Sequence, residues 1–171
     1  DAMTIAWDAA AAFTQRYPQA EVFAFSSSDR SEGTTIQPIP NGYRPARSTS
    51  SNADCSALLW LKHHLGGDLV NTVVVLISDG FPNSHCTNCA PISHTKQVAQ
   101  EMYDEGIRYV SVLVHYDNPS NKRDRADLLQ RAGETLSTFG SLYPADVAVH
   151  VNGPDDFPAM AEAFKALDHR F

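Results

Sequence analysis

One apolar segment places the strongest constraint on what this chain can fold into. Residues 72–83 read TVVVLISDGFPN, a run of branched aliphatic residues that stops at Ser-Asp-Gly and a proline. Such a run predicts a strand buried on both faces, with a turn at Asp79-Gly80. Ligands bind at the carboxyl ends of strands in open α/β sheets, so Asp79 is a candidate ligand-binding residue. A turn without any ligand is the alternative interpretation.

The other apolar patterns alternate between helical and extended spacing. Helical spacing occurs in segments 3–17, 54–65, 98–107, 128–139 and 157–167. Patterns typical of strands occur at 21–26, 73–78, 109–114 and 146–151, with a proline-containing edge strand at 34–39. This alternation predicts an α/β fold with a doubly wound, mostly parallel sheet flanked by helices. We expect residues 1–171 to form a single domain of this kind.

Composition limits the class of partner. The chain has 171 residues, of which 43% are hydrophobic, enough for one domain with its own core. Its formal net charge of −7 gives no electrostatic basis for binding nucleic acid or an anionic membrane. No apolar run approaches the length of a membrane-spanning helix. We therefore expect a soluble protein whose partners are neither nucleic acids nor membranes.

Other sequence features bear on the compartment and on catalysis. Three cysteines are a low, odd number for a secreted disulfide scaffold, which favours a cytoplasmic location. The sequence contains neither a glycine-rich nucleotide-binding loop nor a Gly-x-Ser-x-Gly nucleophile motif. We therefore expect no catalytic residues in this chain.

Three segments resemble the von Willebrand factor A domain. They read VVVLISDGFPN at 73–83, NADCSALLWLKHHL at 52–65 and DDFPAMAEAFKAL at 155–167. The most similar form is the domain at the carboxyl end of the cobalt-chelatase T subunit, which has a similar ALLW helix, a similar ISDG strand end and a similar acidic start to its last helix. The resemblance implies a three-layer sandwich that binds a partner protein.

The resemblance also implies a metal-ion-dependent adhesion site, in which three loops hold Mg²⁺ or a similar divalent cation and a partner's carboxylate completes the coordination. The acid of the third loop corresponds to Asp79. The second-loop position falls near Asn52, with Asp54 close by, in place of the family's threonine. Asn52 and Asp54 can equally be helix caps. The family's first loop, Asp-x-Ser-x-Ser, and the central strand before it do not occur in these residues.

The similarity to the cobalt-chelatase T subunit implies a role in an assembly. In that role the chain is a non-catalytic chelatase subunit in cobalamin biosynthesis, with an AAA+ ATPase and a large chelatase subunit as partners. The alternative is an interaction domain of another assembly, which is ATPase-coupled, RNA-protein or phage-encoded, because a fold by itself does not specify function.

A second group of candidate ligands follows Asp79. His85, Cys86, Cys89 and His94 combine a Cys-x-x-Cys spacing with two histidines, a pattern that can hold Zn²⁺. Cys55 begins the predicted helix at 54–65 and can supply a further ligand from the same face of the sheet. A thiol-redox pair, a local disulfide and ordinary surface thiols are the alternatives. A zinc or thiol-redox protein is thus a third functional hypothesis.

Overall fold

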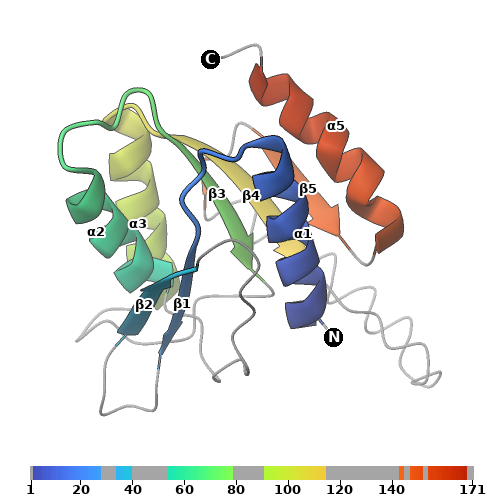
Figure 1. The fold of residues 1–171 in the computed structure, drawn as a ribbon. Helices are drawn as coiled ribbons and strands as arrows, with labels where there is room; N and C mark the ends of the chain where they lie inside the picture. The colour runs from blue at the N-terminus through green and yellow to red at the C-terminus, as the bar shows by residue number, and fades with distance from the viewer. Residues whose placement is uncertain are drawn as a thin grey trace.

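The fold was obtained as a computed structural model, which describes residues 2–27, 34–39, 54–78, 91–114, 143–144, 147–151 and 154–168. Figure 1 shows the described elements in space. In chain order they are α1 (Ala2–Arg16), β1 (Phe23–Ser27), β2 (Thr34–Pro38), α2 (Asp54–Leu65), β3 (Val73–Ser78), α3 (Pro91–Asp104), β4 (Arg108–Val114), β5 (Val147–Val151), the 3-10 helix η1 (Pro154–Asp156) and α5 (Phe157–Asp168). The helix predicted at 128–139 lies outside the described residues.

The centre of the described fold is a parallel sheet in the order β3-β4-β5. In its register Val73 lies opposite Arg108, and Val110 lies opposite Val147. A backbone hydrogen bond of 3.1 Å from the Arg108 amide to the Thr72 carbonyl extends the pairing of β3 with β4 by one residue. The predicted α/β class with parallel strands is therefore confirmed for these three strands.

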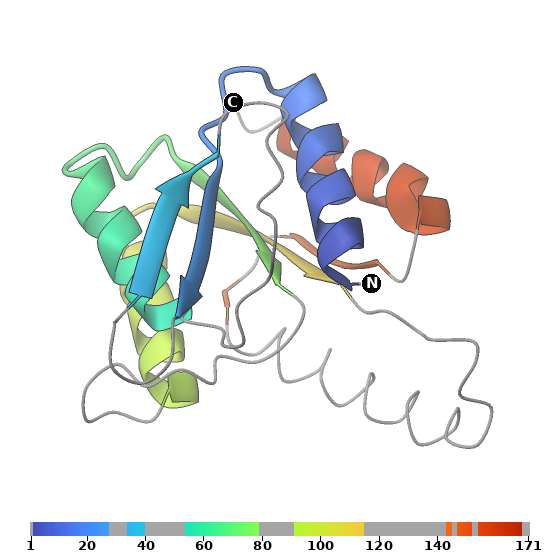
Figure 2. The same ribbon diagram turned by 60° about the horizontal axis from the view of Figure 1, so that its bottom comes forward.

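The first two strands form a separate antiparallel hairpin, in which Phe23 lies opposite Pro38. Within the described residues this hairpin shares no strand pairing with the parallel sheet. Its strand β2 pairs only with β1 there, which agrees with the predicted edge strand at 34–39. Figure 2 shows the hairpin beside α2. Ring contacts from Phe23 to Trp60 and to His64, with centroids 4.9 and 5.3 Å apart, join β1 to that helix.

Side chains alternate between the two faces of the parallel sheet and build two core clusters. Tyr109 and Leu113 of β4 belong to the cluster covered by α2 and α3. Val110, Val112 and Val114 point the other way, into the cluster covered by α1 and α5. Figure 1 shows the same division, with α2 and α3 on one side of the sheet and α1 and α5 on the other.

Burial along β3 matches its position between these clusters. Val74, Leu76 and Ser78 are buried, and the intervening residues are partly buried against the α1 and α5 cluster. The strand predicted at 73–78 therefore has the expected bounds, and one of its two faces is more completely covered than the other.

Helix α1 packs on α5 through aromatic side chains. The rings of Phe13 and Phe164 meet edge to face at 5.0 Å, and the Tyr17 hydroxyl donates a 3.1 Å hydrogen bond to the Phe164 carbonyl. The most buried positions of α1 are Ile5 and Ala9. The helical spacing predicts a buried stripe of Met3, Trp7, Ala10, Phe13 and Tyr17. Phe13 and Tyr17 pack against the α1 and α5 cluster as expected, whereas Trp7 and Ala10 are only partly buried.

Helices α2 and α3 lie next to each other on the opposite face. Their C-terminal ends are joined by a 2.6 Å ion pair between Lys62 and Glu105. The helix expected to include Ile107 ends earlier, at Asp104, since Gly106 adopts a φ of 116° and turns the chain into β4. Ile107 is fully buried in the turn that follows the helix.

Candidate functional site

Two helices begin at the edge where the parallel strands end. Helix α2 has 12 residues and is about 18 Å long, and the six residues of β3 span about 20 Å. Residues 66–72 connect the end of α2 to the start of β3, so the first turn of α2 lies near that strand's carboxyl end. Residues 105–107 connect α3 to β4 in the same way. The positive ends of both helix dipoles therefore lie at the edge where α/β sheets bind ligands.

Asp54 is the first residue of α2 and is 1% exposed. A carboxylate in the first turn of a helix interacts favourably with the helix dipole, as the predicted capping role requires. Its burial also means that the protein must compensate its negative charge internally. Among the described residues from the predicted adhesion site, Asp54 is thus the one placed to attract a cation.

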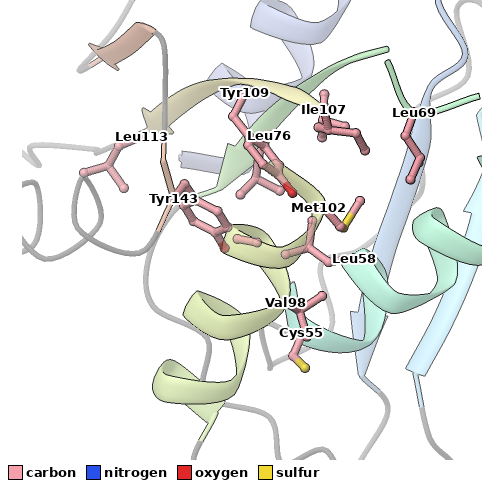
Figure 3. Packing of buried hydrophobic residues seen from close by; sticks show 12 residues of the cluster. Cys55, Leu58, Leu69, Leu76, Val98, Met102, Ile107, Tyr109, Leu113 and Tyr143 are labelled. Atoms are coloured by element: carbon pink, nitrogen blue, oxygen red, sulfur yellow. The ribbon is translucent and has the colours of Figure 1, made fainter. Parts of the chain in front are cut away.

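Tyr143 is a buried neighbour of Asp54. Burial and then the negative charge of Asp54 raise the pKa of Tyr143 well above its ordinary value, with smaller electrostatic contributions from Tyr109 and Cys55. Tyr143 is only 2% exposed and belongs to the α2 and α3 cluster. The Tyr143 hydroxyl and the Asp54 carboxyl group are therefore buried neighbours at the first turn of α2. Figure 3 shows the Tyr143 and Tyr109 rings in this cluster. Cys55 and Leu69 lie at opposite ends of the cluster in that view.

Cys55 and His94 bring the first turns of α2 and α3 into contact. The Cys55 Sγ atom lies 3.2 Å from the His94 Nδ1 atom. Cys55 is 2% exposed, whereas His94 is half-buried. A pair of this kind can share a proton or can ligate a soft metal ion.

Two further polar residues, Thr95 of α3 and Ser78 of β3, are also buried. Thr95 follows His94 and is fully buried, and its hydroxyl has no hydrogen-bond partner among the described residues. Ser78, the last residue of β3, is also buried and leads directly into Asp79. Buried polar side chains are unusual enough that their concentration near the ends of these elements marks this region as the candidate site.

Two residues of the predicted site set fall within the described part of the chain. These two residues are Asp54 and His94. Cys55, which the sequence suggested as an additional zinc ligand, contacts His94. The other predicted site residues, which lie outside the described ranges, are Asn52, Asp79, His85, Cys86 and Cys89. No group of three or more His, Cys, Asp or Glu side chains that could hold a metal ion is found among the described residues.

Sequence reasoning did not identify Tyr143 or Thr95. Tyr143 precedes Pro144 in a segment with no helical or strand periodicity, so no local pattern signals that its hydroxyl lies near Asp54. Thr95 sits in an ordinary helical sequence, and only the packing of α3 makes it buried. Their positions depend on contacts between segments that are far apart in the chain.

Comparison with protein-family models, curated proteins and solved structures finds no match to this chain. The described residues also contain no helix long and apolar enough to cross a membrane. Interpretation of the site therefore depends on its geometry and on the sequence motifs.

Proposed function

We propose that this chain is a von Willebrand factor A-type interaction module. In this proposal its sheet is a doubly wound sandwich, and the module binds partner proteins through a divalent cation such as Mg²⁺. The cation is held by Asp79, Asn52 and Asp54 at the carboxyl edge of the sheet. Oxygen ligands of these types suit a hard cation that keeps some of its water.

The burial of the Asp54 carboxylate at the first turn of α2 is the observation that carries this proposal. At 1% exposure the Asp54 carboxyl group lies in the protein interior, where a nearby cation would stabilise its ionised form. The helix that bears it starts at the carboxyl edge, where β3 ends at Ser78 and leads into Asp79. Asp54 thus begins an element at this edge, and Asp79 follows the last residue of β3 in the sequence.

The arrangement of the strands supports the fold assignment. In the von Willebrand factor A sheet, the central strand lies between the strand that corresponds to β1 and the one that corresponds to β3. The hairpin β1-β2 and the sheet β3-β4-β5 are separate in the described residues, as expected when that central strand is not among them. Helices on both faces of the parallel sheet agree with the same architecture.

The partner proposed first is an AAA+ ATPase of a chelatase complex, with a large chelatase subunit beside it. This choice follows the similarity of the ALLW helix and the ISDG strand end to the cobalt-chelatase T subunit. The same module in another ATPase-coupled, RNA-protein or phage-encoded assembly is the alternative. In either case catalysis belongs to the partners.

Titration of the full chain with Mg²⁺, followed by thermal unfolding, tests the cation site. A ligand that binds only the folded state stabilises it by about 2.7 kcal/mol at 100 times its Kd. We expect this stabilisation in the wild type and its loss in Asp79→Ala. Asp68→Ala is the control, because Asp68 is an exposed acid in the connection that leads to the opposite edge of the sheet. Equal Mg²⁺ responses in all three proteins would reject the site.

Partner binding is tested with a purified AAA+ ATPase of the chelatase class in the presence of Mg²⁺ or of a chelator. We expect complex formation that needs both Mg²⁺ and Asp79. A chain that binds Mg²⁺ through Asp79 but does not bind the ATPase would favour the alternative assembly.

A further inference from the structure

We propose that protonation of His64 strengthens the attachment of the β1-β2 hairpin to α2, so that the hairpin is a pH-sensitive element of this fold. His64 lies in the last turn of α2, at the opposite end of the helix from Asp54. The inference therefore concerns a different part of the molecule from the cation site and does not depend on the proposed function.

The β1-β2 hairpin depends on packing for its order. A two-stranded hairpin by itself is at best marginally stable in water. Within the described residues this hairpin shares no strand pairing with the parallel sheet. It is held instead by side chains, among them Phe25, which packs against the α2 and α3 cluster, and Phe23, which meets Trp60 of α2. The strength of such contacts sets how often the hairpin opens.

His64 lies at the centre of the contact between α2 and the hairpin. Trp60 and His64 are four residues apart, so they share one face of the helix. Their rings stack, with centroids 4.7 Å apart and planes inclined by 11°. From the hairpin side, the Phe23 ring meets the His64 ring edge to face at 5.3 Å. The Glu21 Oε2 atom lies 3.2 Å from the His64 Nε2 atom.

The hairpin presents Glu21 and Phe23 to the helix together. The two residues are two positions apart, a spacing that puts both side chains on one side of an extended segment. A 2.8 Å hydrogen bond from the Ile39 amide to the Val22 carbonyl continues the hairpin pairing into this segment. Opening of the hairpin would therefore separate His64 from Glu21 and from Phe23 at once.

The charge of His64 changes the strength of this contact. A neutral imidazole can keep the ring stacking and a hydrogen bond to Glu21. A protonated imidazole adds an ion pair with the Glu21 carboxylate and a cation–π interaction with the face of Trp60. Opening the hairpin removes the ion pair, so opening costs more when His64 is protonated. The attachment thus strengthens as the pH falls through the interval from about 8 to 5, in which histidines titrate, and weakens as the pH rises.

Glu21 is the ionisable group that contacts His64 among the described residues. Residues 22–27 and 34–39 carry no charged side chain, so the hairpin offers no competing charge there. Lys62 of α2 pairs with Glu105 of α3 at 2.6 Å. The other charged residues at this end of α2 and α3 are exposed or bonded within their own segment, namely His63, Asp68, Glu101, Asp104 and Arg108.

Tryptophan fluorescence tests the protonation of His64 against Trp60. The chain has two tryptophans, so Trp7→Phe leaves Trp60 as the single one. A protonated imidazole quenches an indole that it contacts, by accepting an electron from the excited ring, and a neutral imidazole does so much less. In the Trp7→Phe background we expect the emission to fall between about pH 8 and pH 5. Adding His64→Gln should abolish the fall. His63→Gln, a change at the exposed neighbouring histidine, is the matched control and should retain it.

Hydrogen exchange of the full chain tests the attachment of the hairpin. Amide protection in residues 22–27 and 34–39 is compared with that in β4, after correction for the pH dependence of intrinsic exchange. We expect the protection of the hairpin relative to β4 to rise about two- to fivefold between about pH 8 and pH 5.5, the size typical of an exposed ion pair or cation–π contact. The rise should be absent in His64→Gln, smaller in Glu21→Gln and unchanged in His63→Gln.

Three results would overturn the proposal. Constant Trp60 emission across this pH range would show that no protonated imidazole forms against the indole. Quenching that requires His64, without any change in hairpin protection, would show that His64 titrates without affecting the attachment. An equal rise in protection in the wild type and in His64→Gln would assign the response to another group. The Mg²⁺ response is measured at constant pH, so the two proposals are tested separately.

Discussion

Gly106 shows how one residue sets the path of the chain between α3 and β4. Its φ of 116° is a conformation that side chains with a Cβ rarely adopt. A Cβ at this position would lie 3.1 Å from the Val70 Cα atom, a contact with backbone that cannot move aside easily. Gly66 also has a positive φ, of 62°, where α2 ends, but nothing lies within 4 Å of a Cβ built there.

We predict that Gly106→Ala lowers the free energy of unfolding by about 1–3 kcal/mol, the usual cost of holding a non-glycine residue in such a conformation. Urea denaturation followed by circular dichroism measures this change. Gly67→Ala is the matched control, because Gly67 lacks a positive φ and a Cβ there meets nothing within 4 Å. Its stability should stay within about 0.5 kcal/mol of the wild type or rise slightly. Equal effects of the two substitutions would contradict the prediction.

Individual residues of the site differ in how well the sequence predicts them. Asp54 was recognised as the start of a helix, because an acid before an apolar helical pattern is a typical N-terminal signal. Its near-complete burial was not predictable, since it depends on packing with Tyr143. The sequence suggested only that Cys55 lies on the same face of the sheet as the other candidate zinc ligands. The contact of its Sγ atom with the His94 Nδ1 atom could be found only from the structure.

At the scale of elements, α5 is held to the sheet and to α1 by a few large side chains. Phe164 is 2% exposed and contacts the ring of Phe13. Its backbone carbonyl accepts the hydrogen bond from Tyr17. The final helix was predicted from its apolar spacing at 157–167, and its observed bounds are Phe157–Asp168.

We predict that Phe164→Ala destabilises the protein by about 3–5 kcal/mol, because it removes a buried aromatic ring and leaves a cavity between two helices and the sheet. Equilibrium denaturation measures the loss. Lys165→Ala is the neighbouring control. Its side chain is 51% exposed and pairs with Glu162 at the surface, so we expect a change within about 0.5 kcal/mol. A cost below about 1 kcal/mol for Phe164→Ala would show that α5 contributes little to the core.

Element types were more predictable than their contact surfaces. Strands β3, β4 and β5 were found within one residue of their predicted bounds, because buried apolar runs bounded by polar turns are a strong signal. The buried side of α1 was predicted only in part, because Phe13 and Tyr17 pack against the core as expected but Ile5 and Ala9 are the most buried positions. Apolar residues occur on several sides of this helix, so its sequence alone permits more than one buried stripe. Packing of α1 in the cluster that includes α5 buries Ile5 and Ala9.

At the scale of the whole molecule, two buried tyrosines couple the stability of the α2 and α3 core to alkaline pH. Burial, and to a smaller extent the charge of Glu105, raises the pKa of Tyr109 above its ordinary value. The pKa of Tyr143 is raised mainly by burial and by Asp54. Both hydroxyls therefore stay neutral in the folded protein at pH values where the unfolded chain ionises.

We predict that stability is unaffected by these tyrosines below about pH 10 and falls above it, because the unfolded state then binds fewer protons than the folded state. The decrease should approach about 1.4 kcal/mol per pH unit for each tyrosine. Urea midpoints measured between about pH 9 and 11 test this. The double variant Tyr109→Phe with Tyr143→Phe should lose most of the slope. An unchanged slope in the double variant would contradict the assignment.

The sequence by itself determined the element types and the parallel sheet, because local periodicity and turn residues report which segments are extended, helical or buried. It also supplied the resemblance on which the proposed function rests. Only the tertiary structure decided that, within the described residues, the β1-β2 hairpin shares no strand pairing with the parallel sheet, that Asp54 lies buried beside Tyr143, and that Cys55 contacts His94. The physical reason is that these contacts join residues distant in the chain, and their formation depends on how helices pack on a common sheet and not on any local pattern.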